Sequence, residues 1–175
     1  MASQNPDMDE ATSIHPPINN ITDALTFQMS TLVAESSVAG GAIMREQFGL
    51  SLNEWRVIGL TYALEPATIA KIRKILHMDR GQLSRVVVAL TGRDLLSTRP
   101  SETDLRSVEL SLTPKAAKLH DAVLASVRES NEIVVSALTP SECTEFLRLL
   151  KKITVHRHTK NGFISLLDEP WQETD

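Results

Sequence analysis

This chain of 175 residues has a single cysteine, Cys143, so it cannot form a disulfide within itself. Chains without disulfides are typical of reducing compartments, where thiols stay free. The sequence also has no apolar run near the roughly 20 residues that a membrane-spanning helix needs. Its first ten residues are polar and acidic, unlike a secretory signal. We therefore expect a soluble, cytoplasmic protein.

Aromatic residues make up only 4% of the chain, so any core must be built from aliphatic side chains. The sequence shows neither a glycine-rich loop that could hold phosphates nor an evident nucleophile paired with a base. His156 and His158 are two positions apart, so on a helix they would point to different faces and would not readily chelate one ion. These features favour a protein that is not an enzyme and needs no metal or other cofactor.

Positive charge is scarce overall but concentrated in one segment. The chain has a formal net charge of −4, yet residues 68–113 hold eight basic and five acidic side chains. A local excess of positive charge, rather than the total, brings a protein to the phosphates of nucleic acid. We therefore expect residues 68–113 to bind double-stranded DNA. Because the excess is modest, contacts with bases must contribute as well.

The segment from Asp79 to Leu90 predicts a helix with two different faces. Asp79 is a good helix cap, and Gln82 three residues later would complete a capping box. The positions with helical spacing, which should be buried, are Leu83, Val86, Val87 and Leu90. The opposite, polar face carries Arg80, Gly81, Gln82, Ser84 and Arg85. Such side chains suit phosphates and base edges in a major groove, although a solvated helix face would look the same.

The flanking segments complete the outline of a winged helix-turn-helix. Residues 68–76 predict a short helix, and Met78 and Asp79 form the turn before the next one. The buried side of the short helix should hold Ile69, Ile72, Ile75 and Leu76. Residues 95–99 and those from Arg106 predict two strands joined by a turn, with Arg99 and Arg106 near its tip. In the second strand, the side chains of Val108, Leu110 and Leu112 should face the core. Those of Ser107, Glu109 and Ser111 should face solvent.

Long amphipathic helices are predicted on both sides of this unit. Their apolar stripes exceed what a small winged helix can cover, so a second copy of the chain should cover them. The expected fold class is mainly α (α+β), a winged helix-turn-helix domain with long N- and C-terminal dimerisation helices. The predicted organisation is a mobile arm at 1–17, a dimerisation helix at 18–48, a DNA-binding domain at 49–113, dimerisation helices at 114–160 and a tail at 161–175.

Residues 50–119 resemble the MarR family of bacterial transcription regulators. The resemblance rests on Leu52, on residues 55–58, on the helix-turn-helix and on a wing that carries Asp104, Arg106 and a Leu-Thr pair at 112–113. Asp94 stands where the family usually has glycine, and Asp tolerates a left-handed conformation better than most residues. Leu105 stands where the family often has a basic residue, which removes one possible contact with DNA.

The resemblance implies a homodimeric repressor that binds a palindromic operator and is released by a small molecule, in the family commonly an aromatic or phenolic acid. The residues expected at the DNA are Arg80, Gly81, Gln82, Ser84, Arg85, Arg99, Asp104 and Arg106. Asp104 would hold a wing arginine in place through an ion pair. The effector crevice would be lined by parts of residues 43–60 and 113–128, including Met44, Arg45, Trp55 and Arg56.

Two other interpretations stay open. A winged helix can serve as a protein–protein adaptor without ligand control, but it would then have no need for the unobstructed face at Ser84 and Arg85. Cys143 could make the chain a redox-responsive regulator. However, no lysine, arginine or histidine lies within three residues to activate the thiol, which favours a structural role.

Overall fold

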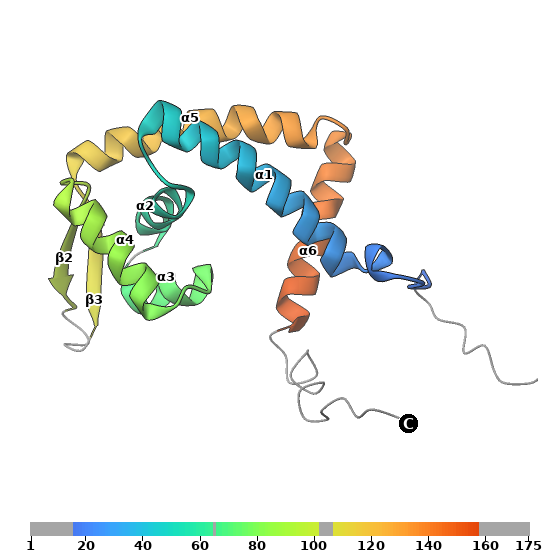
Figure 1. The fold of residues 1–175 in the computed structure, drawn as a ribbon, viewed down its shortest axis with the longest axis horizontal. Helices are drawn as coiled ribbons and strands as arrows, with labels where there is room; N and C mark the ends of the chain where they lie inside the picture. Colours follow the sequence, from blue (N-terminus) through green and yellow to red (C-terminus); the bar gives the residue numbers. More distant parts are fainter. Residues whose placement is uncertain (1–15, 65, 102–106, 158–175) are drawn as a thin grey trace, which may run out of the picture. The chain divides into compact units, whose positions relative to one another are not determined.

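The computed structural model describes residues 16–64, 66–101 and 107–157. The chain divides into two compact units between Val123 and Leu124, and each is described by itself. The elements, in the order shown in Figure 1, are η1 (Ile21–Asp23), α1 (Leu25–Phe48), α2 (Leu52–Ala63), β1 (Ala67–Thr68), α3 (Ile69–Leu76), α4 (Arg80–Gly92), β2 (Leu96–Pro100), β3 (Val108–Leu112), α5 (Pro114–Val135) and α6 (Pro140–Arg157). The mostly helical chain with one small sheet confirms the predicted fold class. Within the described ranges, no helix combines the length and apolar character needed to cross a membrane.

Local hydrogen bonds fix where most helices begin, as the sequence predicts. Ser51 and Glu54 form a reciprocal capping box at α2, since each side chain accepts a bond from the other's backbone N–H. Thr139 and Glu142 do the same at α6. The box predicted at α4 is only half formed. Asp79 accepts a bond from the backbone N–H of Gln82 at 2.7 Å, but the described bonds include none from Asp79 N–H back to Gln82.

The first long helix differs in detail from the prediction. Residues 21–23 form a separate 3-10 turn capped by Asn20, and α1 begins only at Leu25. The Gly40-Gly41 pair does not break the helix, which continues to Phe48. Gly49 ends it with φ of 62°, a left-handed conformation that glycine adopts without steric cost.

Aliphatic side chains form the core of the first unit. Leu83, Val87 and Leu90 of α4 are buried there, and Val86 is half-buried, so the predicted inner face of α4 is largely confirmed. Ile72 of α3 is fully buried. The prediction for Ile75 is wrong, because its side chain is 49% exposed. Ile75 lies one turn from Ile72 but in the last turn of an eight-residue helix, where less of the unit covers it.

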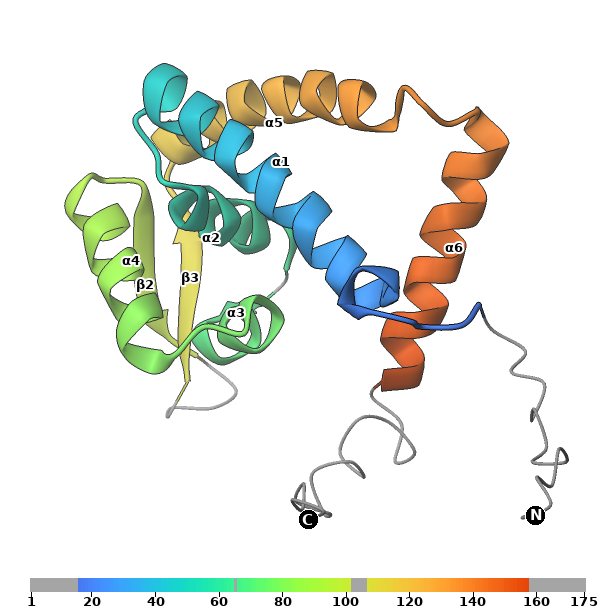
Figure 2. The ribbon, with the colours of Figure 1, turned by 45° about the vertical axis from the view of Figure 1, so that its right-hand side comes forward.

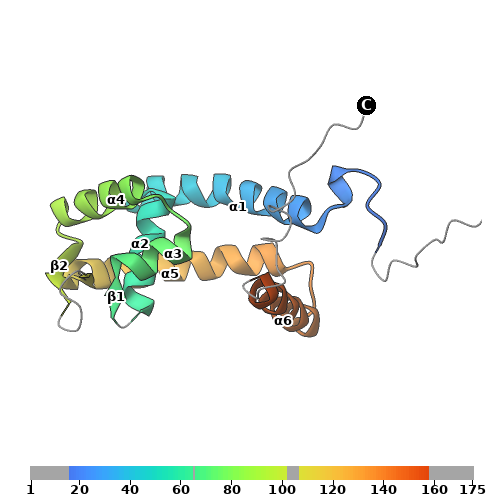
Figure 3. The same cartoon turned by 90° about the horizontal axis from the view of Figure 1, so that it is seen from below.

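The sheet is antiparallel, and β3 lies between β1 and β2. Figure 2 shows β2 and β3 side by side, and Figure 3 shows β1 leading into α3. The alternation predicted for β3 is wrong at two positions. Val108 is 39% exposed, and Glu109 is buried at 7% because Arg99, its partner in the register, lies beside its carboxylate. Two residues are too few to show a strand pattern, so the sequence did not predict β1.

Leu90 tests whether the inner face of α4 holds the unit together. Replacing this fully buried side chain with alanine should lower the free energy of unfolding by about 2–5 kcal/mol, since the cavity cannot refill. Val88→Ala, at a 68% exposed site on the same helix, should change it by less than about 0.5 kcal/mol. Urea unfolding followed by circular dichroism measures both. Equal losses would contradict the assignment of the inner face.

Candidate nucleic-acid interface

Two short helices are held in a fixed relation by the turn between them. Thr68 caps α3 by accepting a bond from the backbone N–H of Lys71. His77 then adopts a left-handed conformation with φ of 51°, and Met78 is buried at 8%. Asp79 starts α4 at the next residue. The turn therefore leaves α4 little freedom to rotate relative to α3.

The far end of α4 is held just as firmly. Arg93 donates one hydrogen bond to Glu54 and another to the carbonyl of Gly49, both at 3.0 Å. Asp94 has φ of 56°, which confirms that aspartate takes the left-handed position expected from the resemblance. Thr113 donates to the carbonyl of Asp94 at 2.8 Å and so joins this turn to the start of α5.

The outer face of α4 presents the predicted polar residues. Arg80, Gly81, Ser84 and Arg85 are exposed, and Gln82 is half-buried. Val88, 68% exposed, continues the row one turn beyond Ser84. Val88 was not predicted at the site, although its place four residues after Ser84 was a usable signal. An exposed aliphatic side chain in such a row can contact a thymine methyl group.

The lack of a side chain at Gly81 leaves room for Asp79 and Arg85 at the start of this face. A Cβ at Gly81 would lie 3.3 Å from an oxygen of Asp79 and 3.6 Å from Nη1 of Arg85. The guanidinium of Arg85 therefore lies back over the first turn of α4. A side chain here would crowd the carboxylate that caps the helix.

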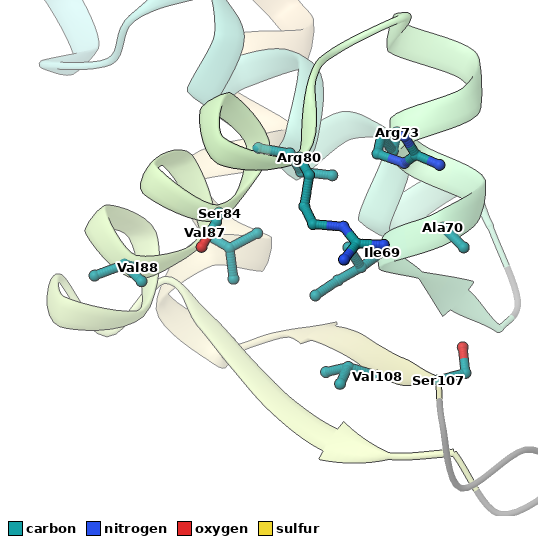
Figure 4. A pocket seen from close by; sticks show the side chains of 10 residues that line it. Ile69, Ala70, Arg73, Arg80, Ser84, Val87, Val88, Ser107 and Val108 are labelled. Atoms are coloured by element: carbon teal, nitrogen blue, oxygen red, sulfur yellow. The ribbon is translucent and has the colours of Figure 1, made fainter.

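A cavity of about 500 Å³ joins α4 to α3 and β3. In Figure 4, Arg80 extends from α4 toward α3, and Arg73 rises from α3. Ser84 and Ser107 add hydroxyl groups from α4 and from the residue before β3. Two guanidinium groups with hydroxyls between three elements suit a phosphate backbone. Arg73 was counted in the basic segment but not assigned to the site, because its face of α3 depends on the fold.

The wing residues are only partly described. Asp104 and Arg106, both predicted at the DNA, lie outside the described residues, as does Leu105. Arg99 is described, and its Nη2 lies 3.0 Å from a carboxylate oxygen of Glu109. Adjacent strand residues point to opposite faces, so Arg99 and Glu109 face away from the cavity that Val108 borders. The structure therefore does not bring Arg99 together with the α4 residues.

Glu109 is an ionised group inside the sheet. The pKa of its carboxyl lies below the ordinary value, first because Ser101 hydrogen-bonds to it and then because Arg99 donates to it and attracts it. Burial acts in the opposite direction, and the positive charge of Lys71 adds to the lowering. Asp104 was predicted to hold a wing arginine in place. Among the described residues, Glu109 does this for Arg99.

The four residues predicted for an effector crevice lie on α1 and α2. Met44 is buried, and Arg56 is exposed. Arg45 folds back along α1, with Nη1 3.4 Å from where a Cβ on Gly41 would stand. Trp55 lies 5.5 Å from the ring of His120, measured between centroids. His120 is 4% exposed and was missed, since a histidine in an amphipathic helix gives no signal of its burial.

Cys143 lies in the second unit, where the turn between α5 and α6 leaves a cavity of about 450 Å³. Val135, Leu138 and Leu147 border it with apolar side chains. The described residues that line it include no basic side chain that could activate the thiol. This surrounding is compatible with the structural role favoured above.

Comparisons with known proteins find a matching family model, a related repressor and structures of the same fold. Residues 48–107 match the model of the MarR family. The transcriptional repressor NicR of Pseudomonas putida is 25% identical over 147 residues, which cover 82% of this chain and 93% of NicR. A MarR/EmrR family regulator from Acinetobacter sp. ADP1 has a TM-score of 0.71 at 23% identity, covering 78% of this chain and 96% of its own. Bordetella bronchiseptica BpsR, whose DNA binding is regulated by 6-hydroxynicotinic acid, has a TM-score of 0.67 at 16% identity, covering 79% and 98%. The two structures show a shared fold.

The pH dependence of stability tests the state of Glu109. Because the pKa of its carboxyl is lowered in the folded chain, the stability it contributes is present above the ordinary carboxyl range and is lost as pH falls through the folded value. Glu109→Gln should lower stability at pH 7 and flatten its fall toward acid. Urea unfolding at a series of pH values measures this.

Glu145→Gln is the matched control. The pKa of Glu145 is also lowered, by a hydrogen bond from Arg148, but both side chains are more than half exposed. Water screens such a pair, so this variant should change little. An unchanged acid profile in Glu109→Gln would show that Glu109 is not held ionised by its neighbours.

Proposed function

The chain belongs to the MarR family of DNA-binding transcription regulators, and we propose that it is a homodimeric repressor that binds a palindromic operator and leaves it when a small aromatic carboxylate binds. The observation that carries this proposal is the outer face of α4. Its exposed residues Arg80, Ser84 and Val88 border a cavity that Arg73 and Ser107 also line, and Arg85 is exposed on the same helix. A helix that presents such a row at its N-terminal end fits a major groove.

The dimer is proposed from apolar side chains that each unit leaves exposed. On α1, Leu25, Leu32 and Val33 are each about half exposed. In the second unit, Ile133 is 75% exposed, and α6 exposes Phe146, Leu147 and Ile153. Exposed rows of this kind mark contact surfaces in proteins. A two-fold dimer would place two α4 helices on two half-sites, which accounts for a palindrome.

Each proposed DNA contact has a chemical role. Gln82 pairs with an adenine edge, because its amide can donate one bond to N7 and accept one from N6, and Arg85 donates two bonds to guanine or to a phosphate. Arg80 and Arg73 bind phosphates. On the wing, Arg106 reaches the minor groove, with Asp104 holding an arginine in place. Arg99 was also predicted at the DNA, but it pairs with Glu109 on the face of the sheet away from the α4 cavity, so we do not propose it as a DNA contact.

The effector class is proposed from the relatives. BpsR responds to 6-hydroxynicotinic acid, a planar aromatic carboxylate, and NicR is a repressor that aligns with most of this chain. The crevice proposed for it lies along α1 and α2, with Met44, Arg45, Trp55 and Arg56. Release follows if the acid binds better to a form in which the two α4 helices no longer match the half-sites.

Salt dependence tests the proposal of DNA binding by two subunits. The logarithm of the affinity for operator DNA should fall steeply with the logarithm of salt concentration, and Arg80→Ala should reduce the slope by about two, or one contact per subunit. Arg148→Ala, from an exposed Arg–Glu pair on α6, should leave the slope unchanged. Fluorescence anisotropy at several salt concentrations measures it. A wild-type affinity independent of salt would favour the adaptor interpretation.

Sequence preference separates the helix from the wing. Gln82→Ala should cost about 1–3 kcal/mol on the best operator and little on random DNA, because it removes a base contact. Arg106→Ala should weaken both nearly equally, and Asp104→Ala should partly mimic it, because the minor groove distinguishes little beyond A·T from G·C. The measurement compares a palindrome, with half-sites about one turn apart, with scrambled DNA of equal length. If Arg106→Ala spares random DNA while Gln82→Ala abolishes binding to it, the two roles are reversed.

A further inference from the structure

A second cavity, of about 880 Å³, lies on the face of the sheet that points away from the α4 cavity. It is bordered by the end of α2, by β1, β2 and β3, and by the first turn of α5. Its volume is within the range of small-molecule sites, about 300–1,000 Å³. Leu64 and Ala117 border it with apolar side chains, and Tyr62 and Arg99 border it with an aromatic ring and a cation.

Among the described residues, positive charge exceeds negative charge around Glu109 and Arg99. Nε and Nη2 of Arg99 both bond to the same oxygen of Glu109, at 3.1 and 3.0 Å. Among the described residues, Nη1 of Arg99 bonds to none. Lys71, whose Nζ donates to the carbonyl of Pro66 at 3.2 Å, also acts on Glu109. In this part of the described chain one carboxylate thus faces two cations, and the 63% exposed side chain of Arg99 can still bind an anion.

The ring of Tyr62 is exposed but held in place. It stacks on the ring of His120 at 4.0 Å between centroids, with 20° between the planes. His120 is buried, whereas Tyr62 is 58% exposed and borders the cavity. A fixed, exposed ring offers a flat surface to another flat molecule, because offset stacking adds to simple burial.

We propose that this cavity binds a planar aromatic monocarboxylate, whose carboxylate pairs with Arg99 and whose ring packs on Tyr62. The bound acid competes with Glu109 for the guanidinium. Arg99 and Glu109 are opposite each other in the register of β2 and β3, so binding weakens a link between the two wing strands. This is a site separate from the proposed crevice on α1 and α2. Its effect on DNA rests on the proposed function, but the binding itself does not.

Methyl NMR of the full-length protein tests the site directly. The probes are benzoate and 6-hydroxynicotinate at millimolar concentration, each compared with its primary amide. Both acids should shift the methyl resonances of Ala117 and Leu64, and the amides should not. Absence of these shifts, or equal shifts with the amides, would overturn the proposal. Shifts confined to the methyls of α1, such as Ala42, would assign the acid to the other crevice and also overturn it.

Three variants separate recognition from damage to the fold. Arg99→Gln should weaken acid binding by at least about tenfold, because a bond between charged groups is lost. Glu109→Gln removes the competitor and should strengthen binding severalfold, a gain that damage to the sheet would not produce. Arg148→Gln, from the exposed pair on α6, should bind like wild type. Weaker binding in Glu109→Gln, with its other methyl resonances unchanged, would refute the competition.

The remaining alternative is that Arg99 binds a DNA phosphate. In that case Arg99→Gln would reduce the salt slope of operator binding by about two, as Arg80→Ala should. We expect the slope to stay unchanged, and we expect the acids to release operator from wild type but less from Arg99→Gln. If wild type bound no DNA, the proposed function would fail while the NMR result would still decide the site.

Discussion

The burial of one side of α4 is the constraint on which the rest of the interface depends. Leu83, Val87 and Leu90 are enclosed by the core, so the helix cannot rotate without exposing them. Each residue advances about 100° around a helix, and this fixes Arg80, Ser84 and Val88 on the outside. Burial of apolar surface contributes about 25 cal/mol per Å² to the free energy of folding. The inner face therefore stabilises this orientation far more strongly than any contact of the outer face. The outer residues are thus free to serve recognition.

What the sequence could predict depends on contacts between near neighbours. The caps at Ser51, Asp79 and Thr139 form between residues three apart, so their side-chain types were enough. The left-handed position of Asp94 was expected from the resemblance, and it follows from a turn that few other residues tolerate. The inner face of α4 was visible because apolar spacing carries over directly from sequence to helix. For the same reasons the fold class and most helix boundaries were within reach.

What the sequence could not predict depends on distant partners. The alternation of the strand predicts that Glu109 faces solvent. Its burial is possible because Arg99, ten residues earlier, and Ser101 bond to its carboxylate. Arg73 joins the α4 cavity only because the turn at His77 sets the angle between two helices. His120 is buried because it meets Tyr62, 58 positions away in the chain. Hydrophobic periodicity contains none of this information.

The register of the wing decides the chemistry of both its faces. Since side chains alternate along a strand, a slip of β2 by one residue would turn Arg99 toward the α4 cavity and break its pairing with Glu109. Two features oppose such a slip. Leu96 would leave the core, and the carboxylate of Glu109 would stay buried without its cation, a costly arrangement. The ion pair between Arg99 and Glu109 therefore stabilises this register, and a ligand that competes for Arg99 would weaken that stabilisation.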